Sequence, residues 1–133
     1  MTRRLQRVLI VEDDLSLRPL WENFFSAQTG KVWLDWAVSC EQALVMILER
    51  NRERKKYHLI ISDIFLAGSG TGIDLIRSKP VRDSGAKTVL VSSAGREEVL
   101  HQYGHLFPDT EFMTKPLDLK NYRELLDSTG RVA

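Results

Sequence analysis

Acidic, hydroxyl and basic side chains follow short apolar runs of this sequence, where they could act together on a phosphoryl group. Glu12 and Asp13 end the run at residues 8–11, and Asp63 ends the run at residues 58–62. Ser93 lies just after the run at residues 88–91, and Lys115 follows a weaker run. A carboxylate beside a hard divalent cation is a competent nucleophile toward phosphorus. These five residues are therefore candidates for a phosphoryl-transfer site.

The elements that must position these side chains alternate between strand and helix patterns. Strands are predicted at residues 8–11, 32–36, 58–62, 88–91 and 111–114. Helices are predicted at residues 16–28, 39–48, 73–79, 97–103 and 119–126. Ser39 is a candidate helix cap, and Pro80 is expected to end the third helix. This order predicts an α/β fold with a parallel sheet covered on both faces, whose ligands bind beyond the carboxyl ends of its strands.

The charges at these strand ends predict a divalent cation. If the first and third strands are neighbours, the carboxylates of Glu12, Asp13 and Asp63 meet in one crevice and repel one another. The ammonium group of Lys115 leaves the set at a formal charge of about −2, which Mg²⁺ would balance through oxygen ligands. Asp14 is expected to be only a cap or a surface acid.

Length and composition narrow the class of protein. The chain has 133 residues and a formal net charge of +1, which suits one domain and disfavours a broad cationic face for nucleic acid. Its single cysteine, Cys40, excludes an internal disulfide. We find no apolar run of 18 residues and no signal peptide. We therefore expect one cytoplasmic domain that contacts neither membrane nor nucleic acid directly.

The motifs together resemble the receiver domain of two-component response regulators over residues 8–126. The resemblance rests on Glu12-Asp13 after the first strand, Asp63 after the third, Ser93-Ala94 after the fourth and Lys115-Pro116 after the fifth. It implies a flavodoxin-like (βα)₅ fold, a doubly wound five-stranded parallel sheet with strand order 2-1-3-4-5. It also implies one receiver domain over residues 1–133, with its core at about 7–127. Because only seven residues follow Leu126, we expect no output domain, and the chain is either a stand-alone receiver or a piece of a longer regulator or hybrid kinase.

The same resemblance implies roles for individual residues. Asp63 would accept the phosphoryl group, and Lys115 would pair with it. The hydroxyl role falls to Ser93, with Ser92 as the alternative, and Phe112 is the expected switch aromatic. Mg²⁺, with Mn²⁺ also possible, would be held by Glu12, Asp13, Asp63 and the backbone carbonyl of Phe65.

The resemblance further implies partners and a signalling surface. The phosphoryl group would come from a sensor histidine kinase or a histidine phosphotransfer protein, and the signal would pass to a downstream protein effector. The expected signalling face comprises the helix at residues 97–103, the strand at 111–114 and the helix at 119–126. The expected state is a monomer or a dimer linked to phosphorylation.

Several residues depart from the usual receiver pattern, and two alternatives stay open. Leu66-Ala67 stands where Met-Pro is common, and the glycine-rich stretch at residues 68–72 is one residue longer than usual. Phe65 and Gly95 have no side chain that could hydrogen-bond an attacking water, which predicts slow hydrolysis of the phosphoryl group. One alternative is a Mg²⁺-dependent phosphohydrolase with an aspartyl-phosphate intermediate, although Phe65 replaces the second aspartate of such enzymes. The other is a degenerate receiver that binds partners without phosphate.

Overall fold

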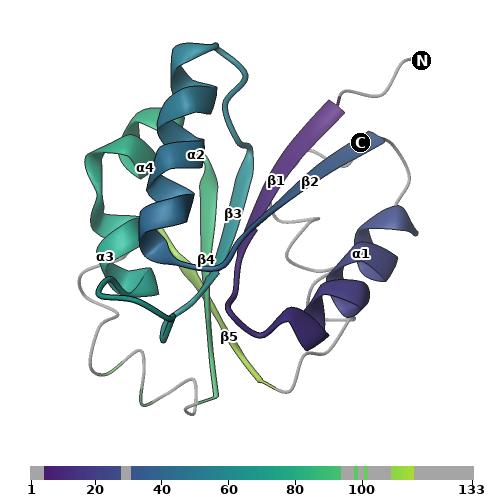
Figure 1. The fold of residues 1–133 in the computed structure, drawn as a ribbon, viewed down its shortest axis with the longest axis vertical. Helices are drawn as coiled ribbons and strands as arrows, with labels where there is room; N and C mark the ends of the chain where they lie inside the picture. Colours follow the sequence, from purple (N-terminus) through teal and green to yellow (C-terminus); the bar gives the residue numbers. More distant parts are fainter. Residues whose placement is uncertain (1–4, 28–30, 94–97, 99–100, 102–108, 116–133) are drawn as a thin grey trace.

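The chain forms one five-stranded parallel sheet with strand order β2-β1-β3-β4-β5. The computed structural model describes residues 5–27, 31–93, 98, 101 and 109–115. The strands are β1 (Leu5–Val11), β2 (Lys31–Ala37), β3 (Leu59–Asp63), β4 (Lys87–Ser92) and β5 (Glu111–Thr114). Figure 1 shows them side by side with helices to both sides. This confirms the predicted fold class and strand order.

The burial of each strand follows its place in the sheet. The central strand β3 is buried at four of its five positions, and β4 is buried at five of six. Such strands need apolar side chains on both faces, which explains their continuous runs of Val, Ile and Leu. Strand β2 lies at one end of the strand order, paired with β1, and is largely exposed or half-buried. The weaker predicted strands are therefore the two edges of the sheet.

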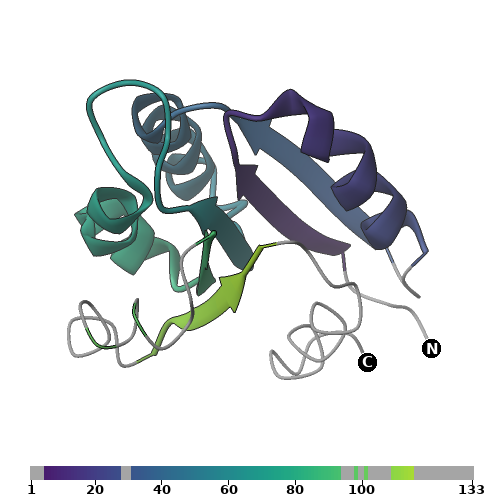
Figure 2. The ribbon, with the colours of Figure 1, turned by 90° about the horizontal axis from the view of Figure 1, so that it is seen from below.

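Helices cover the two faces of the sheet unequally among the described residues. Helix α1 (Arg18–Ser26) lies on one face, preceded by a short 3₁₀ turn at Leu15–Leu17. Helices α2 (Cys40–Arg52), α3 (Gly72–Arg77) and α4 (Lys79–Ser84) lie on the other (Figure 2). Each face has its own apolar core, one around the α1 aromatics and one around Ile47 and Leu75.

Local sequence signals explain where helix α2 begins. The Ser39 hydroxyl accepts a hydrogen bond from the backbone N–H of Gln42, as expected of an N-cap. The Gln42 side chain in turn accepts one from the backbone N–H of Val38, one residue before the cap. The first bond satisfies a backbone donor that the helix leaves unpaired, and the second fixes the residue that precedes the cap. The predicted cap is confirmed.

The prediction that Pro80 ends the third helix was wrong. Helix α3 ends at Arg77, and Ser78 adopts an extended conformation. Helix α4 then starts at Lys79 and carries Pro80 in its first turn. A proline costs little there because the first turn of a helix does not need its backbone N–H. The proline therefore marks a helix start.

Two predicted helices, at residues 97–103 and 119–126, lie outside the described residues apart from the helical Glu98 and His101. In the part of the chain that the structure describes, no helix has both the length and the apolar character needed to cross a membrane.

Candidate functional site

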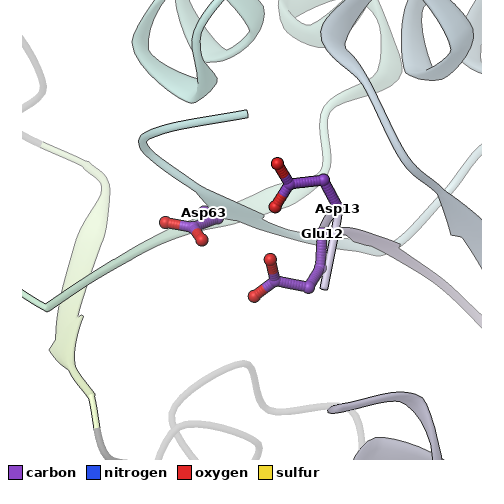
Figure 3. Close-up of side chains that lie close together, drawn as sticks. All are labelled: Glu12, Asp13 and Asp63. Carbon is purple, nitrogen blue, oxygen red and sulfur yellow. The ribbon is translucent and has the colours of Figure 1, made fainter. Parts of the chain in front are cut away.

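Three carboxylates meet at the carboxyl ends of β1 and β3. The two strands are neighbours, with Val11 opposite Ser62, so their ends lie at one edge of the sheet. Glu12, Asp13 and Asp63 each place one carboxylate oxygen so that these atoms all lie within 4.8 Å of one another. Figure 3 shows the three side chains around a common space. The expected meeting of acids at this edge is present.

Lys115 joins two of these acids. Its Nζ donates hydrogen bonds to Glu12 Oε1 and to Asp63 Oδ2, each at 2.8 Å. Its backbone N–H donates to the carbonyl of Ser92 at 2.8 Å, which continues the β4–β5 ladder and fixes the residue at the strand end. The Glu12, Asp63 and Lys115 side chains are 5%, 11% and 24% exposed. The ion pairs are therefore shielded from much of the solvent.

Burial and charge shift the pKa values of this cluster. Desolvation raises the pKa of Glu12 above 4.5, outweighing its hydrogen bonds from Lys115 and from the backbone N–H of Asp14. Burial also disfavours the charged form of Lys115. Hydrogen bonds to Asp63 and Glu12 outweigh that penalty and raise the pKa of Lys115. The charged form of the lysine is thus favoured, whereas burial disfavours the ionised form of the glutamate.

The donor set fits a hard divalent cation. Three carboxylates and one ammonium group carry a formal charge of −2, and the groups facing the common space offer oxygen. Asp13 is exposed, so the space is reachable from solvent. The neighbouring Asp14 plays a different part, because its side chain accepts hydrogen bonds from the backbone N–H and hydroxyl of Ser16. That agrees with its expected role as a cap.

The remaining predicted site residues lie at the same edge or beneath it. Strand β4 ends at the buried Ser92, and Ser93 is the exposed residue that follows. Phe65, two residues after Asp63, has a side chain that is 67% exposed. Phe112 is buried, at 5% exposed, in the core beneath α2, α3 and α4. The roles of these residues in chemistry remain predictions.

Two residues that the sequence analysis did not assign to the site shape its surroundings. Gly72 packs so tightly that an added Cβ would lie 2.0 Å from the carbonyl oxygen of Asp63. Glu41, in the first turn of α2, accepts hydrogen bonds from the loop that follows Asp63. The glycine-rich stretch at residues 68–72 is a sign of such close packing, although it does not identify the partner.

A cavity of about 1050 Å³ lies at the opposite end of the sheet, away from the acids. Arg7, Arg54, Lys56 and Lys87 line it. Helices α2 and α4 both end at this cavity, and cations near a helix C-terminus are favoured by the helix dipole. The helix dipole therefore accounts for the cations that line this end, whereas Arg50, one turn earlier, is ion-paired with Asp35 at 3.2 Å and lies over the Trp33 and Tyr57 rings.

Comparison with known proteins gives the fold. No protein-family model matches the sequence. A two-component response regulator from Clostridium difficile superposes with a TM-score of 0.76 at 21% identity, over 95% of this chain and 96% of that one. A CheY-like receiver domain protein from Methanospirillum hungatei gives 0.71 at 21% identity, over 98% and 100%.

A third structure, the non-phosphorylated HemR receiver domain from Leptospira biflexa, gives a TM-score of 0.68 at 26% identity, over 93% of each chain. In all three comparisons the match covers nearly the whole length of both chains, and the strand order found here is the one that the resemblance implied. The chain therefore has the fold of the receiver domains of two-component response regulators.

Proposed function

We propose that this chain is a signalling receiver switched by phosphorylation of Asp63 in a Mg²⁺-dependent reaction. The observation that carries this proposal is the ion-pair cluster at one sheet edge, where Lys115 contacts Asp63 and Glu12 at 2.8 Å beside Asp13. The receiver fold supports a sensor histidine kinase or a phosphotransfer protein as the phosphoryl donor. A downstream protein effector would receive the signal.

The residues at this edge have complementary roles in phosphoryl transfer. The Asp63 carboxylate attacks phosphorus in line, forming an acyl phosphate as the bond to the donor breaks. Glu12, Asp13, Asp63 and the Phe65 carbonyl would hold Mg²⁺, which offsets charge between the nucleophile and the phosphoryl group. Lys115 then pairs with a phosphoryl oxygen. Its raised pKa keeps it charged for this role at neutral pH.

The switch follows from the added charge. An acyl phosphate dianion replaces a carboxylate monoanion, which adds about one negative charge next to Glu12. The Ser93 hydroxyl, just after the end of β4, would donate to a phosphoryl oxygen, with Ser92 as the alternative. A shift of β4 would displace Phe112 of the neighbouring strand β5, which pairs with Leu90 of β4. The signal would emerge on the face of β5 and the flanking segments at 97–103 and 119–126.

Mass spectrometry after incubation with Mg²⁺ and acetyl phosphate tests the proposal. We expect one added phosphoryl group on the wild-type chain, removed by hydroxylamine as an acyl phosphate is. The Asp63→Asn variant should remain unmodified, while Asp109→Asn, an exposed acid at the far end of the sheet, should be modified like the wild type. Full modification of Asp63→Asn would overturn the assignment.

The same sample separates a receiver from a phosphohydrolase. Phosphohydrolysis through an aspartyl phosphate requires a group that protonates the leaving oxygen, and the exposed Phe65 cannot supply a proton. We therefore expect stoichiometric phosphorylation. Sustained release of inorganic phosphate from small phosphoesters would favour the enzyme instead.

A further inference from the structure

The loop between β3 and α3 is attached to the first turn of helix α2. Glu41 Oε1 accepts hydrogen bonds from the hydroxyl of Ser69 at 2.8 Å and from the backbone N–H of Gly70 at 3.0 Å. Nearby, Ala67 forms an isolated parallel β-bridge with Ser39, the cap of α2. The start of α2 thus holds residues 67–70 of this loop (Figure 1).

Two glycines make this close approach possible. An added Cβ at Gly70 would lie 2.8 Å from Cβ and Sγ of Cys40, a distance that real Cβ atoms do not show. Gly68 has a φ of +93°, which side-chain-bearing residues rarely adopt. Hydrogen bonds from the Glu41 backbone N–H, from Ser69 and from Gly70 lower the pKa of the Glu41 carboxyl group. The attachment is therefore made to an ionised carboxylate at neutral pH.

The other end of the loop is fixed at the acceptor itself. The backbone N–H of Gly72 donates to the carbonyl of Ile64 at 2.8 Å, next to Asp63. Phe65 lies between this closure and the Glu41 contacts, is itself 67% exposed, and is flanked by the buried Ile64 and by Leu66, which packs against the core. Its backbone is thus held by the core packing of its two neighbours together with the attachments on either side.

We propose that Glu41 is a positioning residue for the acceptor site. Its carboxylate holds the loop so that the backbone carbonyl of Phe65 is in place for the divalent cation. Ordering that loop before the cation binds removes an entropic cost from binding. This inference rests on the proposed function, because it assumes that the cation binds beside Asp63.

Mg²⁺ titration followed by tryptophan fluorescence tests this role, since Trp21 lines a small cavity together with Glu12 and Asp63. Glu41→Ala removes the acceptor of both loop hydrogen bonds. We expect it to weaken Mg²⁺ binding about tenfold, the low end for residues that orient metal ligands. Glu41→Gln keeps an amide oxygen at the same place and should restore most of the affinity.

Glu49→Ala is the matched control, because it removes the same charge from an exposed position on the same helix. We expect its Mg²⁺ affinity to match the wild type. Equal weakening in Glu41→Ala and Glu49→Ala would overturn the positioning role in favour of long-range charge, and so would an unchanged Glu41→Ala. If the wild-type chain neither binds Mg²⁺ nor becomes phosphorylated, the proposed function itself is overturned, and this inference with it.

Discussion

At the scale of single residues, Lys115 explains how acidic side chains can share one edge of the sheet without a cation. It donates to Glu12 and Asp63 at once, and so it neutralises part of their repulsion. The compensation is incomplete, because the pKa of Glu12 is raised by its burial. The site therefore holds a group whose ionised form destabilises the metal-free fold.

Replacing Glu12 should change how the stability of the fold depends on pH, because the cost of ionising this buried side chain is removed. A carboxyl group whose folded pKa is raised above 4.5 stabilises the fold while it is protonated, and it loses this contribution as pH rises through the folded pKa. Glu12→Gln cannot ionise. We expect its melting temperature in EDTA to exceed that of the wild type by a few degrees at neutral pH, with the difference shrinking toward pH 4.

Melting curves of both proteins across this pH range measure the effect. Glu49→Gln, on the exposed face of α2, serves as the control and should follow the wild type. A Glu12→Gln variant that is less stable than the wild type at neutral pH would show that the Lys115–Glu12 ion pair outweighs burial.

The site residues that could be predicted from the sequence are those that follow apolar runs. Glu12, Asp13, Asp63 and Lys115 each end or follow such a run, and parallel strands bring these ends together. Glu41 carries no comparable signal, because its partners Ser69 and Gly70 lie 28 and 29 residues away in the sequence. Contacts of this kind depend on how a loop crosses a helix, which local patterns do not encode.

At the scale of elements, the end of helix α2 is a strained turn. The backbone N–H of Arg54 donates to the carbonyl of Asn51, and that of Lys55 donates to the carbonyl of Arg50. This pattern closes a helix through a residue in the left-handed conformation, where glycine is the common choice. Arg54 occupies that position with a φ of 60°. The helix therefore ends at an energetic cost.

Arg54→Gly should stabilise the fold by about 1 kcal/mol, because glycine adopts a positive φ without the steric penalty of a Cβ. Urea denaturation measures the change in the free energy of unfolding. Arg52→Gly is the matched control: Arg52 is the last residue of α2, and glycine there should lower stability by up to about 1 kcal/mol. Destabilisation by Arg54→Gly would mean that its side chain makes compensating contacts.

The strands could be predicted from the sequence, whereas the boundary between α3 and α4 could not. Runs such as residues 59–62 must be apolar on both faces when a strand is buried in a parallel sheet. Proline is compatible both with the end of one helix and with the first turn of another. At Pro80 the tertiary structure decides between them, because α4 packs against α2 through the hydrogen bond from Asn51 to the Pro80 carbonyl.

At the scale of the whole molecule, the proposed cation should stabilise the fold because its ligands come from two strands. A ligand that binds only the folded state at ten times its Kd adds about 1.4 kcal/mol to the free energy of unfolding. We expect Mg²⁺ to raise the stability of the wild type by this amount in urea denaturation. Asp13→Asn, which removes a ligand from an exposed position, should lose most of the gain.

Asp109→Asn is the control for nonspecific ionic effects, since Asp109 lines the cavity at the opposite end of the sheet. It should keep the full stabilisation by Mg²⁺, and sodium chloride at equal ionic strength should not reproduce it. A similar Mg²⁺ effect on Asp13→Asn and on the wild type would place the cation elsewhere.

The contact between Gly72 and the Asp63 carbonyl has a mechanical consequence. No atom fits between them, so the acceptor's backbone and the first residue of α3 are in direct steric contact. Any displacement of that backbone would therefore act directly on the N-terminus of α3. The proposed modification of Asp63 would thus have a direct steric route to the α2–α4 side of the sheet, in addition to the proposed shift of β4.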